Sequence, residues 1–432
     1  MKDTLRPGYK QTEVGVIPED WDVSSLGELG QFKNGINKRK EDFGHGFPFI
    51  NLMDVFGIPR VSASTTELGF VNSTPAERKL YELRSGDVLF VRSSVKPEGV
   101  GLTTLIPENL PETVFSGFLI RFRDTGLLDQ YFKEHCFWDE SFRNRLISSS
   151  SVSANTNINQ DALKRLQVAV PPLPEQRAIA TALSDVDALL AKLDLLIAKK
   201  RDLKQAAMQQ LLTGQTRLPG FSGAWEVKRL GDMFAFSGGL SASRDQLSDT
   251  GHCYLHYGDI HLSRKTYIDL EAEILDIPKL DVPLAEVSSS AILKDGDIVF
   301  VDASEDDEGT SKHLVVVNPE DRPYISGLHT IVAKSKGNDL ANLFKRYCFQ
   351  TSSIREQFRF FAVGTKVSGI SKTSIAKIEL SYPPSLDEQT AIAAVLSDMD
   401  AEIAVLEARR DKTRALKQGM MQELLTGRIR LV

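Results

Sequence analysis

The segment from Pro174 to Leu212 reads PEQRAIATALSDVDALLAKLDLLIAKKRDLKQAAMQQLL. A second segment, from Asp387 to Leu425, reads DEQTAIAAVLSDMDAEIAVLEARRDKTRALKQGMMQELL. The two align without a gap at an offset of 213 residues, from Gln176 on Gln389 to the Leu-Leu-Thr-Gly that closes each copy. Roughly half of the aligned residues are identical. Agreement of this extent indicates an internal duplication.

Both copies carry the apolar spacing of one long helix. Apolar residues alternate steps of four and three, which is the spacing of a coiled-coil seam. They are Ile179, Leu183, Val186, Leu190, Leu193 and Ile197 in the first copy, and Ile392, Leu396, Met399, Ile403 and Leu406 in the second. A single helix cannot bury such a stripe alone. We expect the two copies to pack antiparallel and to hold two domains a fixed distance apart; the alternative is a generic oligomerisation helix.

The duplication extends into the sequence before each helix. Trp21 to Glu28 matches Trp225 to Asp232, and Leu83 to Val91 matches Leu293 to Val301, whereas the sequence between these blocks diverges. The predicted fold class is α+β, with two pseudo-symmetric mixed α/β domains joined and spaced by two long antiparallel coiled-coil helices. The predicted boundaries are 1–172 for the first domain, 173–215 for its helix, 216–385 for the second domain and 386–432 for its helix.

Within each domain, short β-branched runs predict strands and spaced aromatic residues predict helices. The predicted strands are 88–91, 118–122, 298–301 and 314–317, and helical spacing covers 128–147 and 340–361. A polar loop follows in each half, at 148–157 and 363–368, and then a short helix or turn at 160–166 and 372–378. A strand ending in a diproline leads into each long helix, and the two prolines should stiffen that junction.

The composition is that of a globular protein without a membrane-spanning helix. The chain has 432 residues, of which 25% are charged and 41% hydrophobic, and its net charge is −6. A negative charge is unusual for a stand-alone nucleic-acid binder but leaves room for local basic loops. The sequence contains no membrane-length apolar run and no secretory signal, and its three cysteines lie far apart. These features predict a cytoplasmic protein in a reducing compartment.

The motifs of several enzyme classes are absent from the sequence. It has no GxxxxGK[ST] phosphate loop and no Cys or His partners at zinc spacing. The acidic segment from Asp302 to Glu308 does not alternate ligands with a turn glycine at the required place, which favours a solvated loop over a metal site. The Ser-Tyr-Pro-Pro run at 381–384 lacks the leading Asn or Asp of an amino-methyltransferase motif. We therefore expect no catalytic residues, no metal site and no cofactor on this chain.

Two diverged domains, two near-identical long helices and no catalytic motif resemble the specificity subunits of type I restriction-modification systems, the HsdS family. The resemblance covers nearly the whole chain. It rests on the opening run from Tyr9 to Trp21, the Gly-Asp-hydrophobic strands at Gly86 and Gly296, the Pro-Pro-x-x-x-Gln helix entrances and the Leu-Leu-Thr-Gly endings. The second entrance departs from this pattern by one extra residue.

The resemblance implies a non-catalytic subunit of a DNA adenine methyltransferase and restriction endonuclease complex. Each globular domain would be a target recognition domain that reads one half of a split site in double-stranded DNA. The helices would set the spacing and dock two modification subunits. Those partners would bind S-adenosylmethionine and methylate adenine, and a restriction subunit would join to translocate and cleave DNA.

Three kinds of loop in each domain are candidates for contact with DNA. Arginine suits guanine, asparagine suits adenine, carboxylates accept from cytosine, and lysine mostly grips phosphate. The candidates in the first domain are Asn34, Lys38, Arg39, Lys40, Arg92, Ser93, Ser94, Lys96, Ser153, Asn155 and Asn157. Those in the second are Ser241, Arg244, Ser304, Lys312, His313, Thr365, Lys366 and Ser368. The alternative for each loop is an ordinary solvated surface.

Other functions stay open at the level of sequence. The nearest is the specificity subunit of a methyltransferase that has no restriction partner. A different class is a coiled-coil scaffold that pairs two domains without affinity for DNA. A third is an enzyme whose active site has no familiar motif. The divergent polar loops between matched framework blocks favour DNA recognition.

Overall fold

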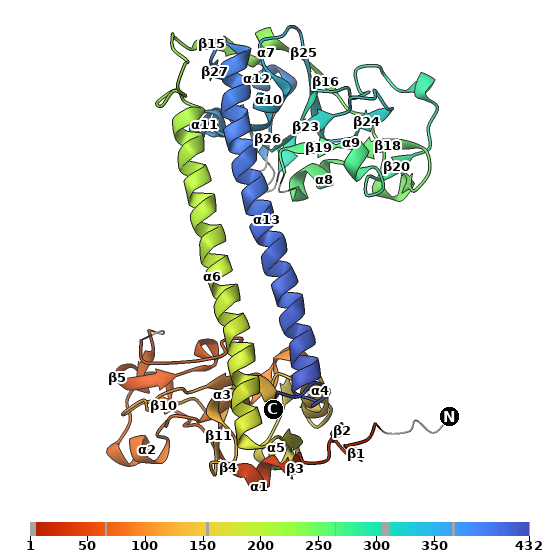
Figure 1. Ribbon diagram of the computed structural model, residues 1–432. Helices are drawn as coiled ribbons and strands as arrows, with labels where there is room; N and C mark the ends of the chain where they lie inside the picture. The colour runs from red at the N-terminus through yellow and green to blue at the C-terminus, as the bar shows by residue number, and fades with distance from the viewer. Residues whose placement is uncertain are drawn as a thin grey trace. The chain divides into compact units, whose positions relative to one another are not determined.

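The computed structural model describes residues 6–64, 67–152, 155–263, 265–304, 312–364 and 368–431. The chain divides into two compact units. Unit 1 comprises Met1–Asp194 and Ala408–Val432, and unit 2 comprises Leu195–Glu407. Each unit therefore contains one globular part of the repeat and a stretch of both long helices (Figure 1).

Unit 1 is built around a four-stranded antiparallel sheet. In spatial order its strands are β4 (Gly30–Asn34), β11 (Leu119–Asp124), β7 (Val88–Val91) and β9 (Thr103–Leu105). The smaller sheets are β10 (Val114–Phe115) with β5 (Phe43–Ile50) and β6 (Gly69–Val71); β12 (Ser151–Val152) with β13 (Thr156–Asn157) and β8 (Ser93–Ser94); β14 (Gln167–Val170) with β3 (Asp22–Ser25); and β1 (Tyr9–Thr12) with β2 (Gly15–Pro18).

The strand β7 is buried along its whole length because the sheet is covered on both faces. Val88 and Phe90 point into one hydrophobic core, and Leu89 and Val91 point into a second core on the opposite face. This division follows from the alternation of side chains along a strand. An apolar run without polar interruption therefore becomes the central support of unit 1.

Unit 2 repeats this plan with a five-stranded sheet. In spatial order its strands are β16 (Phe234–Gly238), β25 (Thr330–Ser335), β21 (Ile298–Val301), β23 (His313–Val317) and β19 (Tyr267–Asp269). The smaller sheets are β17 (Leu247–Ser248), β20 (Lys279–Leu280), β18 (His252–Leu255) and β24 (Tyr324–Ser326); β15 (Glu226–Arg229) with β27 (Glu379–Tyr382); and β22 (Ala303–Ser304) with β26 (Ser368–Gly369).

The prediction of helical segments at 128–147 and 340–361 needs a correction, because each is two helices. A new helix begins after Asp139, whose side chain accepts a hydrogen bond from Phe142 N, and another after Thr351, which caps Ile354 N. Such N-cap residues begin a helix in a new direction. The short helices are α1 (Leu26–Leu29), α2 (Pro75–Leu80), α3 (Gln130–Cys136), α4 (Glu140–Ser148), α5 (Gln160–Arg165), α7 (Leu230–Met233), α8 (Tyr257–Leu262), α9 (Leu270–Glu273), α10 (Asn342–Cys348), α11 (Ser352–Phe361) and α12 (Lys372–Ile375).

The two long helices are α6 (Leu173–Leu211) and α13 (Leu386–Leu424). Both begin at their predicted bounds, 173 and 386, and both end before their predicted bounds, 215 and 432. They pack antiparallel within each unit. In unit 2, Lys200 Nζ lies 2.6 Å from Glu402 Oε1, and Lys204 Nζ lies 2.6 Å from Asp400 Oδ1. In unit 1, Lys417 Nζ lies 2.6 Å from Asp187 Oδ1. The ion pairs flank the predicted seam, whose leucines and isoleucines are buried or half-buried.

The start of each long helix is clamped by the segment that follows the other helix. In unit 1 the buried Glu175 accepts hydrogen bonds from Trp21 Nε1 at 2.9 Å and from Arg430 Nε at 2.7 Å. In unit 2 the buried Glu388 binds Arg217 in the same way. These ion pairs hold the pKa of both arginines above the usual value. The arginine that follows each Leu-Leu-Thr-Gly ending therefore binds at the start of the opposite long helix.

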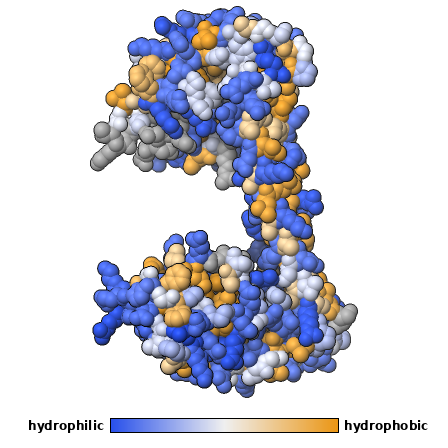
Figure 2. Space-filling model, turned by 90° about the vertical axis from the view of Figure 1, so that its left-hand side faces the viewer, coloured by the Kyte–Doolittle hydropathy of each residue, from blue (hydrophilic) through white to orange (hydrophobic). Residues whose placement is uncertain are grey.

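No helix among the described residues is both long and apolar enough to cross a membrane. The face of the molecule in Figure 2 is mostly hydrophilic, with separate hydrophobic patches on each unit. This surface agrees with the ordinary charged fraction of the sequence.

Candidate nucleic-acid interface

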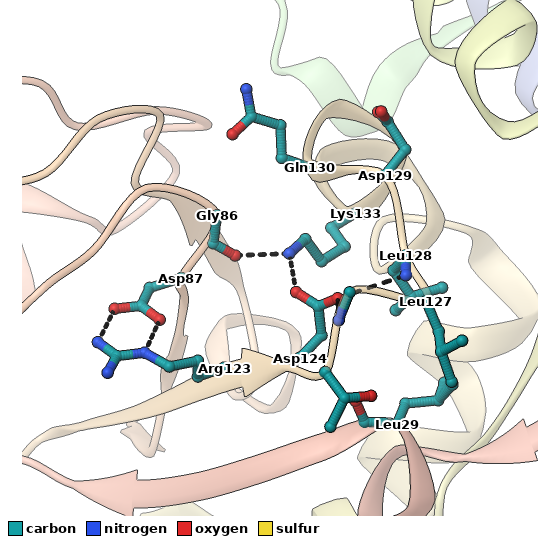
Figure 3. Close-up of polar contacts among 12 residues, drawn as sticks. Leu29, Gly86, Asp87, Arg123, Asp124, Leu127, Leu128, Asp129, Gln130 and Lys133 are labelled. Atoms are coloured by element: carbon teal, nitrogen blue, oxygen red, sulfur yellow. Dashed lines mark hydrogen bonds and ion pairs between the residues drawn. The ribbon is translucent and has the colours of Figure 1, made fainter. Parts of the chain in front are cut away.

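A buried lysine holds the Gly-Asp turn that begins the central strand of unit 1 (Figure 3). Lys133, on α3, donates to Gly86 O at 2.7 Å and also binds Asp124 at the end of β11. Arg123 forms two 2.7 Å hydrogen bonds with the neighbouring Asp87. Because a buried ammonium needs partners on all sides, this network fixes the start of β7. Because the start of β7 is fixed, the position of its other end is fixed as well.

Unit 2 holds its Gly-Asp turn in the same way. Lys345, on α10, donates to Gly296 O at 2.9 Å, and Lys334 pairs with Asp297 at 2.6 Å. Burial lowers the pKa of Lys345. The equivalent lysine and the equivalent carbonyl thus support the central strand in both units, although the surrounding sequences differ.

Three segments meet at Arg92, the first residue after β7. Its N–H donates to Phe118 O at 2.8 Å, and its carbonyl accepts from Ile158 N at 2.9 Å. Its Nη1 makes one long contact of 3.5 Å with Gly117 O. Ser93 and Ser94 then pair as β8 with Asn157 and Thr156 of β13. The second and third candidate loops therefore form one small sheet.

The first candidate loop reaches the same junction from the other side. A Cβ on Gly35 would lie 2.1 Å from Ser116 O, so only glycine permits this approach of the two backbones. Gly117 N then donates to Ile36 O at 2.8 Å. All three predicted loops of unit 1 thus converge on the turn 116–118.

Unit 2 builds the same junction around Asp302. In the sheet, Val301 pairs with Thr330 as Val91 pairs with Leu119, so Asp302 takes the place of Arg92. Its N–H donates to His329 O at 3.2 Å, and its carbonyl accepts from Ile370 N at 2.8 Å. The strand that follows, β22, pairs with β26 as β8 pairs with β13.

A glycine closes this junction as well. A Cβ on Gly239 would lie 1.9 Å from Gly327 O, so the first loop of unit 2 reaches the turn as it does in unit 1. The same backbone arrangement thus presents an arginine in one unit and an aspartate in the other.

The structure separates the predicted residues of unit 1 into three groups. Arg92, Ser93, Ser94 and Asn157 lie together at the junction, and Asn34 ends β4 beside it. Arg39, Lys40, Lys96 and Asn155 are exposed on the loops. Lys38 is only 14% exposed and pairs with Glu77 at 2.9 Å, so its charge is already compensated. Ser153 lies outside the described residues.

In unit 2 one predicted residue must be withdrawn. His313 is 5% exposed, and its ring packs on Phe300 and Phe349, because it begins the buried strand β23. A direct contact of this ring with DNA is incompatible with that burial. Lys312 donates to His261 O at 2.6 Å, and Arg244 pairs with Asp259 at 3.1 Å.

The remaining predictions in unit 2 have mixed outcomes. Ser241 is exposed, and Ser304 and Ser368 pair through their backbones in β22 and β26. Thr365 and Lys366 lie outside the described residues. These positions stay predictions as DNA contacts.

The candidate junctions also contain Asp302, Phe118 and His329, which the sequence does not predict as site residues. The sequence predicts Asp302 in a solvated acidic loop, although it follows Phe-Val as Arg92 does. The sequence predicts a strand that begins at Phe118, but this residue lies in the turn before β11 and is 57% exposed. His329 takes the corresponding place in unit 2, with φ +58°. The matched Phe-Val pair was the signal that could have identified the aspartate.

Two segments of the chain, residues 18–198 and 223–413, match the family model described as the type I restriction modification DNA specificity domain. The chain is 25% identical to the putative type I restriction enzyme MjaX specificity subunit of Methanocaldococcus jannaschii, over 98% of this chain and 97% of that protein. It is 23% identical to the StySPI specificity subunit of Salmonella potsdam, over 95% and 89%.

Solved structures show the same fold. The type I restriction-modification S subunit of M. genitalium superposes with a TM-score of 0.53 at 15% identity, covering 97% of this chain and 99% of that one. A chain from a study of complex assembly and conformational transition of the type I R-M system superposes with a TM-score of 0.56 at 14% identity, covering 96% and 99%.

Proposed function

Because this chain belongs to the family of type I restriction-modification specificity subunits, we propose that it is the non-catalytic subunit that reads a bipartite DNA site. Each unit would read one half of the site with the junction around Arg92 or Asp302. The observation that carries this proposal is that both units build one backbone framework and present different polar side chains on it. Such an arrangement suits two readers of different base sequences.

The proposal extends to partners that dock on the helices. Leucines outside the apolar seam stay exposed on α6: Leu189 in unit 1, and Leu196 and Leu203 in unit 2. Exposed apolar rows of this kind suit a contact with another protein. We propose that two modification subunits cover the helices, and that a restriction subunit joins them in the full complex.

Catalysis would belong to those partners. The modification subunits would bind S-adenosylmethionine and methylate adenine, while this chain holds them on the chosen sequence. The complex would act on DNA in the cytoplasm. A scaffold that pairs two domains without affinity for DNA is the competing function, and it predicts no sequence preference.

The proposal is tested with the chain and its modification subunits purified together. We expect the complex to methylate adenines in one bipartite sequence, mapped by methylation-sensitive sequencing of a random DNA library. The isolated chain should show no binding of S-adenosylmethionine by calorimetry and no methylation. Methylation by the chain alone, or a complex that selects no sequence, would overturn the assignment.

A further inference from the structure

The first charged residue after the central strand differs in sign between the units. Arg92 and Asp302 occupy equivalent backbone positions, each held by one hydrogen bond from its N–H and one to its carbonyl. Their side chains are therefore presented from the same place on the same framework. We propose that they are paired specificity residues, Arg92 for a guanine in one half-site and Asp302 for a cytosine in the other. This proposal rests on the proposed function.

Arg92 has the donors that a guanine requires. The guanidinium presents a rigid fork of N–H groups, and guanine offers two acceptors, O6 and N7, side by side in the major groove. Among the described residues of unit 1, its side chain makes one long 3.5 Å contact with Gly117 O. This contact orients the guanidinium beside the turn and leaves most of its donors to meet a base edge.

Asp302 needs a base that donates a hydrogen bond, whereas Arg92 needs a base that accepts one. Its side chain is 33% exposed, and its Oδ1 lies 3.3 Å from His329 Nδ1. Phosphates repel a carboxylate, so Asp302 is not suited to contact the DNA backbone. It is suited to a position where a base donates a hydrogen bond to it. Cytosine presents the N4 amino group in the major groove, whereas adenine places the N7 acceptor beside its amino group. The N7 lone pair would repel the carboxylate, which favours cytosine.

Smaller residues stand beside Asp302 than beside Arg92. Strand pairing places Ala303 where unit 1 has Ser93, and Gly369 where unit 1 has Asn157. Both changes shorten the side chain next to the aspartate. Asp302 and these two residues line a shallow hollow of about 350 Å³, together with His329, Phe361 and Val363. The hollow gives a base edge access to the short aspartate side chain.

The test uses the full-length chain with its modification subunits and selection from randomised DNA. Asp302→Asn should shift one position of one half-site from cytosine toward adenine, because an amide suits the N6 and N7 of adenine. The expected change in preference is about 5- to 150-fold. Asp302→Ala should abolish the preference at that same position. Arg92→Lys should weaken a guanine preference in the other half-site only, while keeping the positive charge.

Asp249→Asn is the matched control, since it removes the same charge from an exposed turn of unit 2. It should leave both half-sites unchanged. The inference is overturned if the unmodified chain selects a bipartite site and neither Asp302 variant alters it, or if the Asp302 and Arg92 variants alter the same half-site. An unmodified complex that selects no sequence would overturn the proposed function itself. If Asp302→Asn and Asp302→Ala both change the preference at the same position, the effect comes from reading that base. A misfolded unit would instead lose its preference at every position of the half-site.

Discussion

Lys133 is a buried ammonium whose two partners come from different segments of unit 1. Removing it would leave Asp124 as a half-buried carboxylate without its counter-charge. We expect Lys133→Met to lower the free energy of unfolding of unit 1 by about 3–5 kcal/mol. Urea unfolding measures this loss. The exposed Lys164, paired with Asp161, is the control, and Lys164→Met should change stability by less than about 0.5 kcal/mol. Equal losses would show that the buried network is not what holds the turn.

His135 makes the stability of unit 1 depend on pH. Burial, with the nearby positive charge of Lys417, lowers the pKa of His135 to about 4. The unfolded histidine takes up its proton near pH 6.5, so between about pH 6.5 and 4 the unfolded state binds more protons. Stability from this group is therefore complete at neutral pH and falls as the pH drops through that window. We expect a loss of about 2 kcal/mol between pH 7 and 4.5, measured by urea unfolding.

The equivalent residue of unit 2 suggests a variant that tests whether His135 causes this pH dependence. Tyr347 stands at the equivalent position, and its hydroxyl donates to Asp400 Oδ2 at 2.9 Å. His135→Tyr should donate in the same way to Asp187, which pairs with Lys417 as Asp400 pairs with Lys204. The variant should lose the acid-dependent destabilisation between pH 7 and 4.5. If the pH dependence persists unchanged, another group causes it.

At the scale of the elements, the clamp at the start of α6 ties two helices to one domain. Glu175 is 2% exposed on its side chain and binds both Trp21 and Arg430. Glu175→Gln removes the buried one of the two carboxylates that Arg430 binds, the other being Asp20, and we expect a loss of about 2 kcal/mol. Thermal unfolding of the full chain measures it. Glu423→Gln, which removes the exposed partner of Arg428, should have almost no effect. A similar shift in both variants would contradict the role of the clamp.

The sequence predicted the elements unevenly, and the reasons are physical. The starts of the long helices, residues 173 and 386, were predicted correctly because an unbroken 39-residue periodicity leaves little choice, whereas the predicted ends, 215 and 432, lie beyond the last helical residues Leu211 and Leu424. The break at Asp139 was missed because the aromatic spacing continues across it. Strands such as β8 and β13 have two residues each and pair only through tertiary structure. For that reason the sequence predicts Arg92 as a loop residue but not the sheet that surrounds it.

At the scale of the whole molecule, the divergence between matched blocks predicts that base preference divides by domain. Exchange of Trp21 to Val170 for the same segment of another family member should change one half of the recognised site. The other half should stay the same, because unit 2 keeps its own junction. Methylation mapping of the exchanged complex checks this. A change in both halves would show that the predicted domain boundaries are wrong.

The composition of unit 1 has a consequence for how the protein is made. Its core includes Leu424 and Leu425, although the rest of that core precedes residue 195. Unit 2 is continuous in the chain. A ribosome therefore releases every segment of unit 2 before it releases the closing segment of unit 1. The domain that is synthesised first therefore completes its core last. Until Leu424 and Leu425 pack into it, part of its hydrophobic core is exposed to chaperones and proteases.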